Sequence, residues 1–149
     1  MSIKSLILAA LIFIPVIAYA IPSEIVWGKQ DGVWLTWIPA FTGFSTDPTI
    51  NKASYKQVGK SVTARVSMNT GVSNATTFTI TLPVAAHGSG LQFFALGQVT
   101  DNSVVQTTPG LLVTRANSTI ADIYKNSANS GWTASGNKRA QFVITYEAQ

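Results

Sequence analysis

The amino-acid sequence predicts one all-β domain, a single antiparallel β-sandwich of jelly-roll-like form, after an N-terminal apolar leader helix. Short runs with period two, rich in Val, Ile, Thr and aromatic residues, recur along residues 33–149. Gly, Asn, Ser and Pro separate these runs, as expected for turns. No stretch of this region keeps the 3.6-residue period of a helix. About eight or nine short strands at this spacing favour a sandwich or jelly roll.

The first twenty residues predict a signal peptide. Lys4 supplies a positive start, and Leu6 to Ile17 is almost entirely apolar. Ala18 and Ala20 then give the small-x-small pattern at which signal peptidase cleaves. The alternative is an uncleaved membrane anchor, because the uncharged stretch approaches the roughly 20 residues that a spanning helix needs. We therefore expect an exported chain, secreted or associated with a surface or virion, and membrane-anchored if residues 1–20 are retained.

The rest of the chain divides into a lead-in arm, residues 21–32, and the sandwich domain, residues 33–149. The chain contains no cysteine, so packing, a bound ion or oligomerisation must stabilise it outside the cell. Its net charge is +4, but the basic residues are scattered. Lys52, Lys56 and Lys60 form the nearest thing to a cluster, and lysines of this kind commonly protect a strand edge. We expect no nucleic-acid partner.

Two runs show the strand pattern most clearly. Val62, Ala64, Val66 and Met68 are predicted to face inward, and Tyr55 to Met68 reads as a hairpin that turns at Gly59. The run "TTFTITLP" places Phe78, Ile80 and Leu82 on one face, and Pro83 is expected to end that strand. The other predicted strands are Trp34 to Phe41, Gln92 to Val99, Val104 to Thr107, Leu111 to Arg115, Thr119 to Tyr124 and Gln141 to Tyr146.

The sequence offers no clear arrangement of catalytic residues. His87 is the single histidine, and although Ser89 is near it, two residues apart in a loop is not the geometry of a nucleophile and its base. The acidic residues that could pair across a cleft are Glu24, Asp31, Asp47, Asp101, Asp122 and Glu147. Several of them adjoin Gly, Pro or Asn, where aspartate commonly stabilises turns. We predict no enzyme, no cofactor and no metal site; a small hydrolase around His87 or an aspartate pair is a distant alternative.

The aromatic residues are the best candidates for recognition. The chain has four tryptophans, and strand alternation puts Trp34 and Trp37 on opposite faces. At least one of the two is therefore expected outside the core, in a subunit contact or a ligand site. The candidate interface or ligand-stacking residues are Trp34, Trp37, Phe44, Tyr55 and Trp132, and a subunit contact is favoured over sugar binding.

A long span of the chain carries a family resemblance. Its features are "WIPAFTGFS" from Trp37, "YKQVGK" from Tyr55, "SNATTFTITLPVAA" from Ser73 and the closing "ADIYKNSANSGWTASGNKRAQFVITYEA". Together they resemble a β-domain found in tail-fibre and other virion structural proteins of tailed bacteriophages and prophages. The likeness covers roughly residues 33–148. It implies a structural or receptor-contacting domain, trimeric and without enzymatic activity.

The leader departs from that pattern, because tailed-phage fibres carry no export signal. Three interpretations remain open: a virion protein held in a membrane, a phage-derived domain on a bacterial surface, and a secreted binding protein of the host. The leading hypothesis is a non-enzymatic viral or virus-derived structural or adhesion protein that self-associates and contacts a cell-surface glycan or receptor. The alternative is a secreted carbohydrate-binding module with exposed Trp and Tyr residues.

Overall fold

A computed structural model describes residues 32–88 and 92–149, and these residues form strands, turns and loops without a helix. The predicted all-β antiparallel class is confirmed, since every strand pairing is antiparallel. The expected leader helix at 1–20 and almost all of the lead-in arm lie outside the described residues. Within the described ranges, no helix is long and apolar enough to cross a membrane. The strands are β1 (Leu35–Thr36), β2 (Phe41–Thr42), β3 (Phe44–Thr46), β4 (Ile50–Val58), β5 (Ser61–Ser73), β6 (Phe78–Ala86), β7 (Phe94–Asp101), β8 (Val104–Val105), β9 (Gly110–Thr114), β10 (Ser118–Tyr124) and β11 (Asn137–Glu147).

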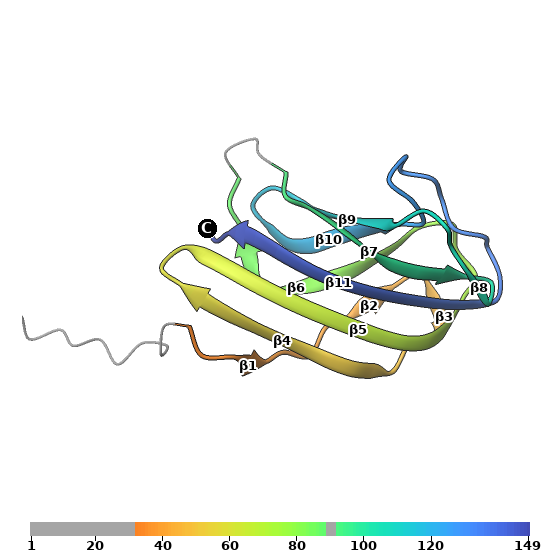
Figure 1. Ribbon diagram of the computed structural model, residues 1–149, viewed down its shortest axis with the longest axis horizontal. Coiled ribbons are helices and arrows are strands. Elements are labelled where there is room, and N and C mark those ends of the chain that lie inside the picture. The colour runs from red at the N-terminus through yellow and green to blue at the C-terminus, as the bar shows by residue number, and fades with distance from the viewer. Residues whose placement is uncertain (1–31, 89–91) are drawn as a thin grey trace, which may run out of the picture.

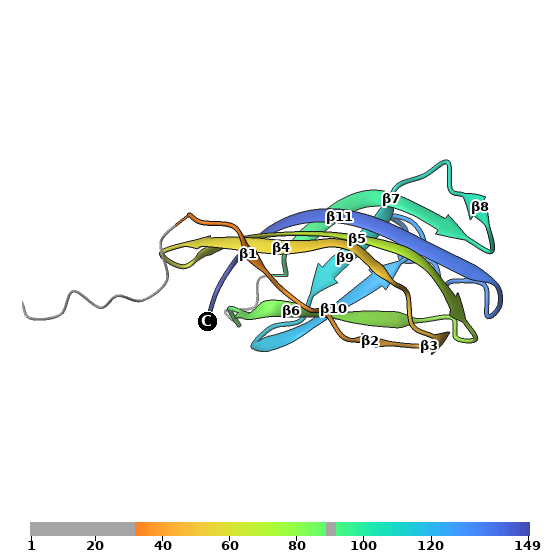
Figure 2. The same ribbon diagram turned by 90° about the horizontal axis from the view of Figure 1, so that it is seen from below.

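All eleven strands belong to one sheet, with the order β1-β4-β5-β11-β7-β9-β10-β6-β2; β3 pairs with β5 and β8 with β7. The sheet is strongly curled, in the manner of a half-barrel (Figure 1). Figure 2 shows the result in side view: β4, β5 and β11 lie in one layer, here called layer A, and β6, β10 and β2 lie in the facing layer B. The core occupies the space between the two layers.

Strand β7 turns the sheet from one layer to the other. Its C-terminal half pairs with β11 in layer A, from Gln98 opposite Gln141 to Asp101 opposite Lys138. Its N-terminal half pairs instead with β9, from Phe94 to Gly97. The change of partner occurs at Gly97, where a Cβ atom would overlap the carbonyl oxygen of Gln141 and the ring of Phe142. Only glycine lets the two backbones approach this closely.

A second connection joins the layers near the other end of the sheet. Strand β2 pairs with β6, and β3 pairs with β5 only two residues later. The chain therefore passes from layer B to layer A within Phe41–Thr46. Ser73 stabilises this connection, because its hydroxyl donates a hydrogen bond to the carbonyl oxygen of Gly43 at 3.0 Å.

The core follows the alternation that the sequence predicts. Val62, Ala64, Val66 and Met68 of β5 are all buried, and so are Phe78, Ile80 and Leu82 of β6. The hairpin at Gly59 is also confirmed, since β4 and β5 pair from Val58 opposite Ser61 onward. Inward residues of β11 complete the packing: Ala140, Phe142, Ile144 and Tyr146.

Several predicted strand boundaries were wrong. Strand β6 does not end at Pro83 but continues to Ala86, because the β6–β10 register shifts between Ser118 and Ile120 and this irregularity accommodates the missing N–H. The predicted strand Trp34 to Phe41 is two short strands, β1 and β2, separated around Pro39. Residues 44–46 form strand β3, although no strand was predicted there.

A buried ion pair ties the loop before β11 to the sheet. Lys138, whose side chain is 0% exposed, places Nζ 2.6 Å from Oδ1 of Asp101 and donates to the carbonyl oxygen of Ser135 at 2.6 Å. The other oxygen, Oδ2, accepts from the Thr133 N–H at 3.1 Å and hydroxyl at 2.9 Å. Burial raises the pKa of Asp101, but the bonds from Lys138 and Thr133 outweigh it, and the net pKa lies below the ordinary value.

Candidate functional site on the outer face of layer A

The structure separates the predicted aromatic candidates into core and surface residues. Trp132 is 2% exposed, and its indole N–H donates to the Ile123 carbonyl at 2.7 Å. Trp37 is also buried, with its N–H directed to the Thr81 carbonyl at 3.2 Å. Phe44 and Tyr55 are partly buried and pack against the same core. Trp34, at 40% exposure, is the most exposed of the five candidates.

The expectation of ligand stacking therefore does not fit Trp37 and Trp132, which fill the space between the layers. Trp132 packs against Phe78 with ring centroids 4.5 Å apart, and Phe78 in turn contacts Phe44 at 4.8 Å. The opposite-face prediction for Trp34 and Trp37 agrees with the structure, since one is exposed and the other buried. Ala18 and Ala20, the predicted cleavage site, lie outside the described residues.

This division predicts unequal effects of two tryptophan substitutions. Trp132→Ala should lower the free energy of unfolding by about 3–5 kcal/mol, because it leaves a cavity between the layers. Trp34→Ala should cost about 1 kcal/mol or less, since it removes an exposed ring and its cation–π contacts. Urea unfolding followed by circular dichroism measures both. Equal losses for the two variants would show that Trp34 is as deeply packed as Trp132.

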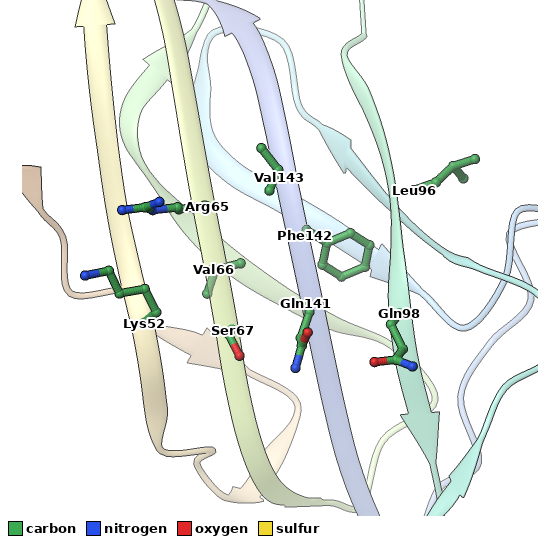
Figure 3. Close-up of a pocket in the computed structure, with 9 residues that line it drawn as sticks. All are labelled: Lys52, Arg65, Val66, Ser67, Leu96, Gln98, Gln141, Phe142 and Val143. Carbon is green, nitrogen blue, oxygen red and sulfur yellow. The ribbon is translucent and has the colours of Figure 1, made fainter. Parts of the chain in front are cut away.

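A groove of about 410 Å³ lies on the outer face of layer A, beside the position where β7 leaves β11. Figure 3 shows side chains from β4, β5, β11 and β7 lining it. Four of them form a polar row across the strands, because Lys52 lies opposite Ser67, Ser67 opposite Gln141, and Gln141 opposite Gln98. At the strand spacing of about 4.8 Å, this row extends over roughly 14 Å. The lining residues are Lys52, Arg65, Val66, Ser67, Leu96, Gln98, Gln141, Phe142 and Val143.

Arg65 is held in place at the groove by two neighbours. Its Nε–H donates to the hydroxyl of Ser54 at 2.7 Å. Its guanidinium carbon lies 4.0 Å from the centre of the Trp34 ring, and Nζ of Lys56 lies 5.4 Å from the same ring. A guanidinium stacked on an indole is a favourable cation–π arrangement. The aromatic candidate Trp34 thus acts here as a support for a cation.

Three exposed apolar side chains form a patch on the outer surface of β7 and β11, and two of them also line the groove. Phe94, Leu96 and Val143 are 59%, 59% and 62% exposed, respectively. They alternate with the inward residues of β7 and β11, so all three belong to the outer face. We call these three residues the apolar patch. Large exposed apolar side chains gathered on one face commonly mark a contact with another molecule.

Two of the acidic residues in the described chain form ion pairs within the fold. Asp101 belongs to the buried ion pair, and Asp122 forms a bidentate contact with Arg115 at 2.6 and 2.8 Å. The backbone N–H of His87 donates to the Glu147 carbonyl at 2.8 Å; its proposed neighbour Ser89 lies outside the described residues. In residues 32–88 and 92–149, no three or more His, Asp or Glu side chains gather where they could hold a metal ion.

Sequence reasoning missed most of the groove. Alternation already placed Arg65 and Ser67 on the outward face of their strand, so these two could have been found from the pattern. Gln98 and Gln141 were not singled out, because a lone glutamine on a strand carries no distinctive signal. Their convergence depends on the pairing of β11 with both β5 and β7. With the fold and groove described, comparison with family models, curated proteins and solved structures finds no match to this chain.

Proposed function

We propose that this chain is a non-enzymatic structural or adhesion protein, viral or virus-derived, whose β-domain self-associates outside the cytoplasm or on a virion. The observation that carries the proposal is the apolar patch, with Phe94, Leu96 and Val143 each more than half exposed on one face. Covering such a patch with a second copy would stabilise a domain that has no disulfide. The sequence resemblance favours a trimer. A membrane contact follows only if residues 1–20 are retained.

The finer description of the fold belongs to the same proposal. The curled sheet has two facing layers around one core, as a β-sandwich does, and we propose that it is a jelly-roll-like sandwich in which β7 joins the layers. A domain of this kind displays loops and one outer face while its core stays closed.

Substitution of the patch tests self-association. The double variant Phe94→Gln/Leu96→Gln should convert an oligomer of the wild-type chain to a monomer, because it removes two apolar side chains without adding charge. Light scattering at matched concentrations measures the mass. Val58→Gln is the control, since Val58 is also 55% exposed but lies at the β4–β5 turn, away from the patch. If the double variant keeps the wild-type mass, the patch is not the subunit contact.

A carbohydrate-binding module is the second candidate, and the groove favours it. Trp34 contacts Arg65, which lines the groove. The polar row in the groove supplies hydroxyl, amide and ammonium groups, the types of group that bind sugar hydroxyls. Both proposed functions require a surface that binds a partner outside the cell. They differ in whether self-association is needed.

A further inference from the structure

We propose that the groove on the outer face of layer A binds an acidic saccharide, with Arg65 as the residue that contacts its carboxylate or sulfate group. The inference rests on the adhesion part of the proposed function and does not require self-association. Three features of the groove carry it: its charge, the fixed position of Arg65, and the row of neutral polar groups next to that cation.

The side chains that line the groove carry positive charge. Lys52 and Arg65 line it, and none of the lining residues is acidic. Lys56 adds a third cation beside Trp34. Every ion pair found among the described residues uses another basic residue: Arg115, Lys125 or Lys138. The groove cations therefore have no carboxylate within salt-bridge distance in the described chain, and their field favours an anionic ligand.

Arg65 is arranged for anion binding before a ligand arrives. Its Nε–H is used by Ser54 and one face of its guanidinium lies over Trp34, so the side chain is restrained at two points. The two terminal Nη groups can still donate, and a guanidinium edge matches the two oxygens of a carboxylate or sulfate. Because the side chain is already ordered, binding costs less conformational entropy than it would for a free arginine.

The rest of the groove favours a sugar over other anions. The hydroxyl of Ser67 and the amides of Gln98 and Gln141 can both donate and accept hydrogen bonds, as sugar hydroxyls require. Single-stranded nucleic acid would need aromatic rings on which bases stack, but the ring of Trp34 already carries the Arg65 guanidinium.

Binding to a printed array of sialylated, uronate-containing and sulfated oligosaccharides, with their neutral counterparts, tests the inference. The wild-type chain should bind acidic members and leave the neutral counterparts unbound. For the best acidic oligosaccharide, calorimetry should show at least tenfold weaker binding by Arg65→Gln and by Trp34→Ala, and weaker binding of the wild type at higher salt. Lys60→Gln is the matched control, because Lys60 lies in the β4–β5 turn outside the groove and its loss should leave affinity unchanged.

The proposal is overturned if no acidic saccharide binds, if the neutral counterparts bind equally well, or if Arg65→Gln binds like wild type. A preference for single-stranded DNA in competition would also overturn it. Thermal unfolding of each variant establishes that the fold is intact. Light scattering of the same samples separates the two proposals. If the chain is a monomer and binds acidic saccharides, the groove proposal stands and self-association is wrong. If the chain is an oligomer and binds no acidic saccharide, self-association stands and the groove proposal is wrong.

Discussion

Lys138→Met is expected to lower the free energy of unfolding by about 3–5 kcal/mol, the largest loss that we expect from a single polar substitution in this chain. Methionine keeps most of the apolar stem of lysine but removes the ammonium group, which is fully buried and lies 2.6 Å from Asp101. The Asp101 carboxylate would remain buried with only Lys125 as a charged neighbour, at 3.4 Å. An uncompensated buried charge is far more costly than a lost surface contact. Urea unfolding at neutral pH measures the difference.

Arg115→Met provides the matched control for this substitution. Arg115 also pairs with an aspartate, Asp122, at 2.6 Å, but its side chain is 50% exposed. Exposed ion pairs contribute about 0–1 kcal/mol because water screens them and two long side chains must be ordered. If Lys138→Met costs no more than Arg115→Met, the loop before β11 does not depend on the buried pair.

The same ion pair predicts how stability changes with pH. The pKa of Asp101 is lower in the folded chain than its ordinary value, so the folded state binds this proton less readily than the unfolded state. The resulting stabilisation is fully present above about pH 4 and is lost as the pH falls through the folded value. When the pH falls from about 7 to about 3, the free energy of unfolding should decrease less for Lys138→Met than for the wild type. The reason is that Asp101 in this variant lacks Lys138, the partner that lowers its pKa. Parallel losses would exclude Asp101 as a source of the acid sensitivity.

Gly97→Ala is expected to cost several kcal/mol and to disrupt the pairing of β7 with β11. The new Cβ would overlap the backbone oxygen of Gln141 and the ring of Phe142, and a backbone oxygen cannot move aside as a flexible side chain can. The strand would have to separate from β11 where it changes partner. Amide hydrogen exchange should show lost protection at residues 98–101 and 138–141, and urea unfolding should show the loss in stability.

Gly59→Ala separates this steric effect from the general cost of replacing a glycine. Gly59 has φ +55°, a conformation that costs alanine about 1 kcal/mol, but a Cβ there meets no atom within 4 Å. Its loss of stability should therefore be small and its exchange pattern unchanged outside the β4–β5 turn. A loss as large as that of Gly97→Ala would mean that the close approach of β7 to β11 is not the cause.

The sequence predicted the parts of the fold that depend on local alternation. Val62 to Met68 and Phe78 to Leu82 face inward as expected, because a strand with one buried face must alternate. Pairing over long distances was not predictable. Residues 44–46 have the composition of a turn and become a strand only because the chain crosses between the layers there. The continuation of β6 beyond Pro83 likewise depends on a shift in its register with β10.

The candidate groove was less predictable than the fold, because its residues converge through strand order. Trp34 was identified as a recognition residue, yet its contact with Arg65 requires that β1 and β5 lie on either side of β4. The role of Asp101 was also hidden, since it adjoins Asn102 in a segment that resembles an ordinary turn. Its partner Lys138 is nearby only because β7 pairs with β11.

The native mass of the wild-type chain, measured by light scattering through a dilution series, tests self-association most directly. We predict a trimer that persists on dilution, with the apolar patch covered by neighbouring copies. A monomer at every concentration would contradict self-association. It would leave Phe94, Leu96 and Val143 exposed to solvent or to a different partner, and the acidic-saccharide groove would then be the main recognition surface of the chain.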